Sequence, residues 1–331
     1  MATTVNTRAE DESGKKFLAP RYWLTWAGFG FLWLLHLLHY RLQQPVGHLL
    51  GQVFRLANPY RRKIVSINLS LCFPEHDERQ RRRLARRFFS SLGISMVEES
   101  DSIWSAGGHF NKWGQVEGLE HVRAAQAQGK GVLLLSGHFC SVDFAGRVLV
   151  QHMPVCFTYQ ELRNPLSDHI LTRARDKFAH RMIHRHNIRG FVKALKDGEI
   201  VWYAPDQSLQ RKNSVFAPFF GIPANTLTAT TKLVKMTGAA VLPLAIKRLP
   251  GARGYALTIQ PPLEDFPGES ETADATRFNA LLETQVRANP EQYLWTHRRF
   301  KKRPEGETRL YPPKPRRVRR MRRAEKKRAA R

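Results

Sequence analysis

The sequence predicts an α/β protein whose mostly parallel sheet is flanked by helices. Short runs of β-forming residues alternate with longer amphipathic segments along most of the chain, and this alternation is typical of parallel sheets with helices on both faces. Apolar residues make up 42% of the 331 residues, which is enough to form a core. No internal repeat is evident. We therefore expect one α/β domain over residues 41–306.

The elements can be placed from their residue patterns. Leu84, Phe88, Leu92 and Met96 recur at four-residue spacing, as they would on one face of a helix. Helices are predicted over 61–105, 118–128, 165–179, 189–198, 229–238 and 276–288, with one more starting near residue 139. Strands are predicted over 131–136, 155–159, 199–205, 239–248 and 255–263, where β-branched and aromatic residues are frequent.

Residues 22–40, "YWLTWAGFGFLWLLHLLHY", contain no Asp, Glu, Lys or Arg and have aromatic residues at both ends. A membrane span needs about 20 mostly apolar residues, and Trp and Tyr favour its interfaces. No cleavable signal peptide is indicated. We expect a membrane-anchoring helix here, preceded by an N-terminal segment at 1–21. His36 and His39 allow an interfacial helix, and a buried core helix is the alternative.

The charge balance is strongly basic, with 54 Lys and Arg against 28 Asp and Glu. Such a chain favours anionic partners. Basic runs directly after residue 41 predict that the body is cytoplasmic. The end of the chain, 307–331, is expected to be a disordered basic tail that contacts an anionic membrane surface or is merely solvated. A nucleic-acid-binding protein is the alternative from another class, but no recognition motif appears. Three cysteines without a CxxC pair predict neither a metal site nor a disulfide framework.

The stretch "GKGVLLLSGHFCSVDFAG", residues 129–146, carries the candidate chemistry. His138 follows the end of a predicted strand, where functional groups gather in parallel sheets. Asp143 lies about 140° from it on a regular helix, so the imidazole could reach the carboxylate only from a preceding loop. A carboxylate there would fix the imidazole tautomer, and nearby N–H groups, such as that of Gly137, could stabilise an oxyanion. These groups suit base-assisted acyl transfer to a hydroxyl. The alternative is that His138 merely caps the strand and Asp143 merely caps the helix.

Ser136 and Ser141 lie in the same stretch, but without a G-x-S-x-G elbow they are interpreted as polar turn residues. Asp206 also follows a predicted strand, so it would lie near His138 if the two strands are neighbours, although a helix cap is as natural a use for it. Arg175, on a predicted helix, could hold a phosphate or an oxyanion, although a surface ion pair is the commoner fate of arginine.

Six segments in order resemble the lipid A late acyltransferases of Gram-negative bacteria, the lauroyl and myristoyl type. They are "INLSLCFPE" (67–75), "GVLLLSGHFCSVD" (131–143), "RNPLSDHILTRAR" (163–175), "KALKDGEIVWYAPDQ" (193–207), "SVFAPFFG" (214–221) and "PEQYLWTHRRFKKRPEG" (290–306). The resemblance runs from Pro20 to Gly306. It implies a fold like that of the glycerolipid acyltransferases and an inner-membrane enzyme that faces the cytoplasm. The enzyme would move an acyl chain from acyl carrier protein to a hydroxyacyl chain of a lipid A precursor.

Carried over by position, the resemblance implies that His138 is the general base and Asp143 its carboxylate partner. Arg175 and Asp206 match further residues at the family's site. No cofactor, metal or nucleic acid is expected. The sequence departs from the family at "YQE" (159–161), where lauroyl members commonly have "YRP", and some members have Glu at the position of Asp143. A glycerophosphate acceptor is the alternative, but "YAPDQ" and "HRRFKKRPEG" favour the lipid A type.

Overall fold

The computed structural model describes residues 16–208 and 213–313. Within them, seven strands form one sheet in the order β1-β9-β8-β2-β5-β3-β4. All neighbouring strands are parallel except β8 and β9, so the predicted mostly parallel sheet is confirmed. The strands are β1 (Gly114–Glu117), β2 (Val132–Leu135), β3 (Val155–Tyr159), β4 (Arg181–His184), β5 (Ile200–Tyr203), β8 (Ala240–Arg248) and β9 (Tyr255–Ile259).

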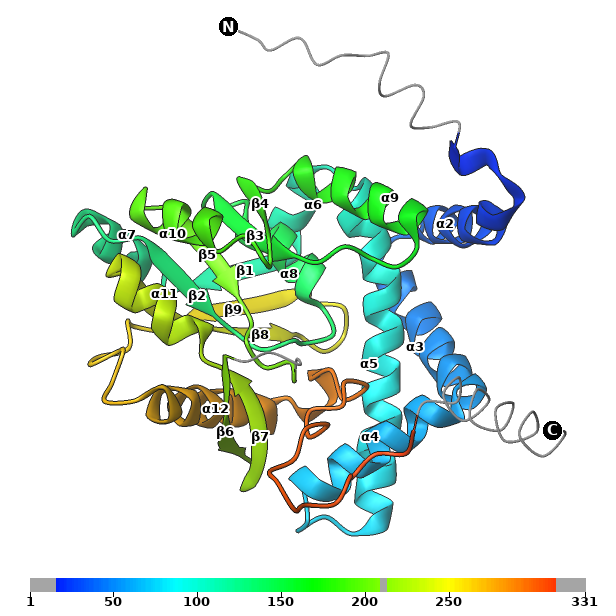
Figure 1. Ribbon diagram of the computed structural model, residues 1–331. Coiled ribbons are helices and arrows are strands. Elements are labelled where there is room, and N and C mark those ends of the chain that lie inside the picture. The colour runs from blue at the N-terminus through cyan, green and yellow to red at the C-terminus, as the bar shows by residue number, and fades with distance from the viewer. Residues whose placement is uncertain (1–15, 209–212, 314–331) are drawn as a thin grey trace, which may run out of the picture.

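Helices cover both faces of this sheet, as the sequence predicts (Figure 1). Alternate residues of β2 enter two separate cores, because successive side chains of a strand point to opposite faces. Leu133 and Leu135 pack with α10 (Ile188–Lys196), α11 (Ala229–Thr237) and α12 (Glu271–Ala288). Val132 and Leu134 pack with α6 (Gly107–Lys112), α7 (Leu119–Ala127) and α8 (Val142–Leu149). The remaining crossover helix is α9 (Pro165–Asp176).

The predicted helical region 61–105 is divided into α4 (Pro59–Cys72) and α5 (Glu78–Trp104). The division has a local cause, because Asp77 caps α5. Its carboxylate accepts from the Gln80 N–H at 2.7 Å, and the Gln80 side chain accepts from the Asp77 N–H at 2.7 Å. Such a reciprocal capping box satisfies two otherwise unpaired donors at a helix start. α5 then crosses the molecule beside α3 (Tyr40–Ala57) (Figure 1).

The single helix expected over 22–40 is wrong in its extent. The chain forms short turns at Lys16–Leu18 and Pro20–Tyr22, then α2 (Trp23–His36), and breaks before α3. Polar side chains explain the break. His36 Nδ1 lies 2.9 Å from the buried Asp101 carboxylate of α5, and Gln43 donates to the same oxygen at 3.1 Å. Among the described residues, no helix combines the length and the apolarity needed to cross a bilayer.

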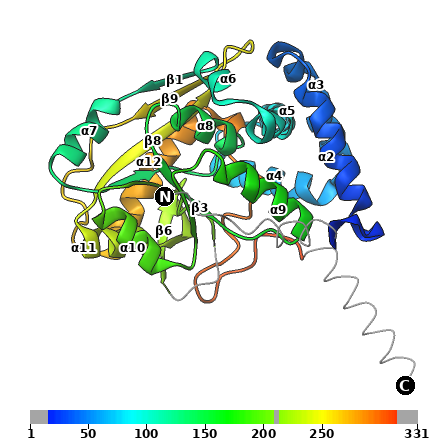
Figure 2. The same ribbon diagram turned by 90° about the horizontal axis from the view of Figure 1, so that it is seen from above.

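Three glycines allow α3 and α5 to approach closely. A Cβ added to Gly51 would lie 1.9 Å from the Phe89 carbonyl oxygen, and one added to Gly93 would lie 2.1 Å from the Gly47 oxygen. No larger residue fits at such a contact without separating the helices, because real Cβ contacts are longer than 3 Å. The two helices therefore meet backbone to backbone along one side of the domain (Figure 2).

Other differences from the predicted elements are local. β1 and β4 were not predicted, and neither was the antiparallel hairpin of β6 (Ser214–Phe219) and β7 (Ile222–Leu227). α12 starts earlier than predicted, at Glu271, because the Ser270 hydroxyl accepts from the Ala273 N–H at 3.1 Å. A side-chain oxygen in this position satisfies a free donor of the first turn.

The predicted domain end at Gly306 lies too early. Leu310 and Tyr311 pack against the main core, and the Phe300 N–H donates to the Tyr311 hydroxyl at 3.1 Å. Tyr311 also donates to the Asn68 side chain on α4. The described chain after Gly306 is therefore part of the domain. The rest of the predicted basic tail, 314–331, lies outside the described residues.

Candidate active site

The predicted site residues His138 and Asp206 meet at the carboxyl edge of the sheet. β2 and β5 are parallel neighbours, with Leu135 in register with Tyr203. His138 follows β2 by three residues and Asp206 follows β5 by three. Two side chains at the same offset from two paired strand ends are brought together by the sheet itself, at the edge where parallel sheets place functional groups.

The Asp206 carboxylate holds the His138 residue through both of its oxygens. One oxygen accepts from the His138 backbone N–H at 3.0 Å, and the other is hydrogen-bonded to His138 Nδ1. Tyr293 donates its hydroxyl to the first oxygen at 3.0 Å. The Asp206 side chain is 2% exposed and the His138 side chain 32% exposed. The carboxylate is thus buried behind a partly accessible imidazole, whose Nε2 is not used by this contact.

The pKa values of the pair fit a charge partnership. Burial alone would lower the pKa of His138, but the Asp206 charge and hydrogen bond raise it above its ordinary value. Burial alone would raise the pKa of Asp206, yet the neighbouring imidazole and its hydrogen bonds hold that pKa below its ordinary value. A carboxylate on Nδ1 fixes the tautomer and stabilises the imidazolium that forms when Nε2 takes a proton. This arrangement would allow His138 to act as a general base.

Asp143 does not lie against the imidazole in the structure. It lies in the first turn of α8, and its carboxylate accepts from Arg175 of α9, at 2.9 Å from Nε and 2.6 Å from the Nη2 nitrogen. The physical reason is the helix start at Val142, which commits Asp143 to helical geometry while His138 stays in the loop. The four predicted site residues therefore form two pairs. Asp143 is paired with Arg175, and His138 is paired with Asp206.

Glu99 of α5 is a neighbour of this second pair that sequence reasoning missed. Burial raises the pKa of the Glu99 carboxyl well above its ordinary value, and the nearby Asp143 charge adds to the rise, against the opposing effect of Arg175. Burial would lower the pKa of Arg175, but the Asp143 and Glu99 charges raise it. Two carboxyls so close together favour a proton on one of them, because their negative charges repel each other, whereas the guanidinium opposes this by stabilising both anions. Nothing in the local sequence of a long helix signals such a contact.

The segment that follows α12 is hydrogen-bonded to the loops that carry His138 and Asp206. The Leu294 N–H donates to the His138 carbonyl at 3.0 Å. His297 accepts from the Ser208 N–H at 3.1 Å through Nε2. Burial is the main reason that the pKa of His297 falls to about 4, so this ring is neutral near pH 7 and can serve as an acceptor. These contacts involve the segment 290–306, whose likeness to the lipid A enzymes was the only sequence signal that pointed to it.

Ser136 and Ser141 have structural partners, which agrees with their interpretation as turn residues. Ser136 accepts from the Trp202 indole at 2.6 Å. Ser141 accepts from Arg248, whose guanidinium is also paired with Glu98 at 2.8 Å. The Arg248 and Glu98 side chains are 7% and 1% exposed. A buried ion pair thus lies directly behind the His138–Asp143 loop and is hydrogen-bonded to it.

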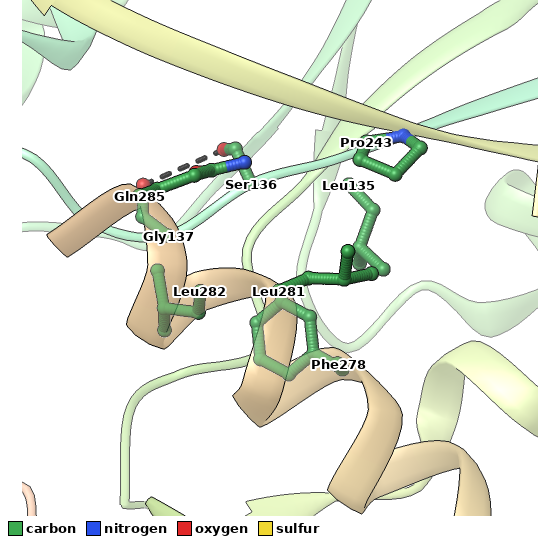
Figure 3. A pocket seen from close by; sticks show the side chains of 8 residues that line it. All are labelled: Leu135, Ser136, Gly137, Pro243, Phe278, Leu281, Leu282 and Gln285. Carbon is green, nitrogen blue, oxygen red and sulfur yellow. Dashed lines mark hydrogen bonds between the residues drawn. The ribbon is translucent and has the colours of Figure 1, made fainter. Parts of the chain in front are cut away.

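Gly137 lies between the strand end and α12. Figure 3 shows Leu282 of α12 beside this bend, and Leu281 and Phe278 of the same helix line the space next to it. The enclosed space there is about 10 Å³, which is room for about one water and not for an acyl chain. A Cβ on Gly137 would lie 2.3 Å from Leu282 Cδ1. A larger residue before the candidate base would therefore have to displace the Leu282 side chain of α12.

Among the described residues, the ligand atoms of Cys156, His180 and Glu199 lie within 4.8 Å of one another. They fit a metal poorly. Glu199 is already paired with the Arg181 guanidinium, and burial, followed by its contact with Glu199, raises the pKa of the Cys156 thiol to about 12. A cysteine must be a thiolate to bind a metal, and this thiol resists deprotonation. The Arg181 guanidinium beside the site would also repel a metal cation.

A parallel sheet with a carboxylate-supported histidine in an H-x4-D loop at its carboxyl edge defines the class of H-x4-D acyltransferases. The particular family follows from sequence comparison. The family model described as bacterial lipid A biosynthesis acyltransferase matches residues 11–302. The chain therefore belongs to this family, as its motifs predict, and is a lipid A biosynthesis acyltransferase.

Curated relatives agree with this assignment. The lipid A biosynthesis palmitoleoyltransferase of Escherichia coli (strain K12) is 41% identical over 90% of this chain and 97% of its own length. The lipid A biosynthesis lauroyltransferase of the same organism is 39% identical over 87% and 95%. A crystal structure of the 1-acyl-sn-glycerophosphate acyltransferase PlsC from Thermotoga maritima covers 77% of this chain and 99% of that chain, at 13% identity and a TM-score of 0.35. At that level the likeness says nothing about function.

Proposed function

We propose that this enzyme transfers a fatty acyl chain from acyl carrier protein to the hydroxyl of a hydroxyacyl chain on a lipid A precursor. The observation that carries the chemistry is the pairing of His138 with the buried Asp206 at the carboxyl edge of the sheet. The family supports the acceptor class. The basic balance of the chain suits both substrates, because the carrier protein is acidic and the lipid carries phosphates.

In the proposed reaction, Nε2 of His138 takes the proton of the acceptor hydroxyl while the hydroxyl oxygen attacks the thioester carbonyl carbon. The carbon–oxygen bond forms and the carbon–sulfur bond breaks. The imidazolium then returns the proton to the leaving thiolate, so the histidine ends as it began. Asp206 holds Nδ1 and stabilises the cation between these two steps.

We propose that Asp143 and Arg175 support the loop that carries the base. Their ion pair ties the first turn of α8 to the end of α9. Both side chains are about a third exposed or less, so the contact is partly screened from water. This role replaces direct contact of Asp143 with the imidazole.

The proposed location is the bacterial inner membrane, with the catalytic domain in the cytoplasm. Large apolar side chains on α2 and α3 face outward, among them Leu24 at 86%, Trp23 at 64% and Leu49 at 63% exposed. Arg21 and Arg41 lie beside them in the sequence. An exposed apolar face bordered by basic residues favours attachment in the plane of an anionic bilayer surface.

The test is the lipid A of a strain that lacks this protein. Mass spectrometry should show the loss of one acyl chain, and the missing mass gives the chain length. The purified enzyme should restore this mass when it is supplied with acyl carrier protein loaded with that chain. An unchanged lipid A, or transfer to glycerophosphate in place of lipid A precursor, would contradict the proposed acceptor.

A further inference from the structure

A large groove is lined by residues of α3 and α5. These two helices lie on the side of the domain away from α7 (Figures 1 and 2). The volume of the groove is about 1210 Å³. One wall is the side of α3 from Arg41 to Arg55, and the other is the side of α5 from Arg83 to Ile94. The turn between β8 and β9 and the residues around 288–292 close one end. Because α3 and α5 are in backbone contact at Gly47, Gly51 and Gly93, the groove lies along the outside of their junction.

Both walls carry cations. The exposed or half-buried basic side chains that line the groove are Arg41, Arg55, Arg83, Arg86, Arg87 and Lys247. Of the described residues that line the groove, Glu291 is the one with a carboxylate. This carboxylate lies 3.1 Å from the Arg87 guanidinium. A cleft with charges of one sign concentrates ligands of the other sign and speeds their association. The groove is therefore a site for an anionic partner.

The groove is long as well as positive. Arg41 and Arg55 are separated by fourteen residues of one α-helix, which corresponds to about 21 Å along the axis. Arginines spread over such a length match a row of carboxylates on a protein surface better than the phosphates of one lipid headgroup. Arginine also pairs with carboxylates through two parallel hydrogen bonds. The α5 wall faces water, since Met96 is the one exposed large apolar side chain of that helix.

The floor of the groove touches the back of the catalytic loop. Arg248, which lines the floor, donates to the Ser141 hydroxyl between His138 and Asp143. The carbonyl of Gln292, another lining residue, accepts from the Cys140 N–H at 2.8 Å. A partner in the groove would therefore contact residues that are hydrogen-bonded to the loop carrying the candidate base.

We propose that the groove between α3 and α5 is the docking surface for the acidic face of the acyl carrier protein. This inference rests on the proposed function, which makes that protein the donor. The arginines of the groove receive its carboxylates, and the contact positions the donor against the residues that support the His138–Asp143 loop from behind. Binding of this kind accelerates encounter at low ionic strength and weakens as salt is added.

The test is the charge-reversal variant Arg83→Glu/Arg86→Glu. Both side chains are exposed and neither has an ion pair with another described residue. The matched control is Arg123→Glu/Lys130→Glu, two exposed basic positions at and after α7. The dissociation constant for acyl carrier protein is measured by fluorescence anisotropy in detergent across a salt series. We expect it to rise at least tenfold at low salt for the groove variant and less than twofold for the control.

Turnover provides the second measurement. The kcat/KM for acyl carrier protein thioester should fall in parallel with affinity, while kcat at saturation stays within twofold, because the groove does not contact the reacting atoms. If the reversed variant unfolds, as judged by circular dichroism, the neutral Arg83→Gln/Arg86→Gln replaces it with a smaller expected loss in the same direction.

Two outcomes would overturn the proposal, and they are distinguishable from failure of the proposed function. Unchanged carrier-protein affinity together with weakened binding to phosphatidylglycerol vesicles would make the groove a lipid-headgroup site. Unchanged values in both assays would leave the groove without a binding role. If the wild-type enzyme itself neither binds nor uses the carrier protein, the donor of the proposed function is wrong, whatever the variants do.

Discussion

Replacement of Asp206 by Asn tells apart the two candidate partners of His138, the proposed general base. The amide keeps the size of the side chain but removes its charge. It cannot accept from both the His138 N–H and the Tyr293 hydroxyl while also accepting from Nδ1, as the carboxylate does. The variant should therefore fold, because the replacement is close in shape, but lose support for the imidazole.

The expected size follows from the contact. A carboxylate within hydrogen-bond distance raises the pKa of a histidine by about 1–3 units, and each unit corresponds to about 1.4 kcal/mol. Loss of the correct tautomer and of imidazolium stabilisation costs about 10²–10⁴ in rate. The wild-type rate should rise with pH, because the base must be neutral, and level off above the raised pKa of His138, which Asp206 supports against burial. In Asp206→Asn this rise should move to lower pH.

The assay is kcat/KM as a function of pH for wild type, Asp206→Asn and Asp143→Asn. Asp143 contacts Arg175 instead of the imidazole, so Asp143→Asn should leave the midpoint of the rise unchanged, whatever its effect on rate. In a His138→Ala background, Asp206→Asn should cost little more, because residues that act as a unit are not additive. A shifted midpoint in Asp143→Asn with none in Asp206→Asn would refute this reasoning.

Three further variants and one control test the packing of the domain. Glu98→Gln should lower the free energy of unfolding by about 3–5 kcal/mol in urea titrations, because it leaves the buried Arg248 charge without its partner; a loss below 1 kcal/mol would show that the charge is solvated. Gly51→Ala should lower the free energy of unfolding by about 1–3 kcal/mol through overpacking. The control Gly28→Ala, where the added Cβ meets nothing within 4 Å, should be nearly neutral. Equal effects of the two variants would contradict the close contact of α3 with α5. Tyr311→Phe should cost about 1 kcal/mol, because the hydroxyl bonds two partners; no change in the urea midpoint would place this residue outside the domain.

The main strands could be predicted because their residues are buried on both faces. Val132–Leu135 is a continuous apolar run, and it forms β2 at the centre of the sheet. β1 and β4 were missed because each has four residues with polar side chains among them. In such short edge strands, pairing with a neighbour outweighs the local pattern.

The site was predictable only as far as strand ends could be located. His138 and Asp206 each follow a predicted strand, so their meeting needs one more fact, that β2 and β5 are neighbours. Strand order depends on contacts between distant segments, which no local pattern encodes. The same holds for Arg175, which reaches Asp143 from a helix packed against α5. Glu99 was missed because its partners come from two other helices.

The order of strands in the sheet also determines when the sheet can be completed during synthesis. β1 pairs with β9, and the two registered residues Gly114 and Tyr255 are 141 positions apart. At about 5–20 residues per second, a ribosome needs about 7–28 s to make that stretch. Through that interval the apolar surfaces that later meet β8 and β9, including the inner face of α8, stay uncovered in the nascent chain. Ribosome-associated chaperones would therefore find uncovered apolar surface on this chain from the synthesis of β1 until that of β9.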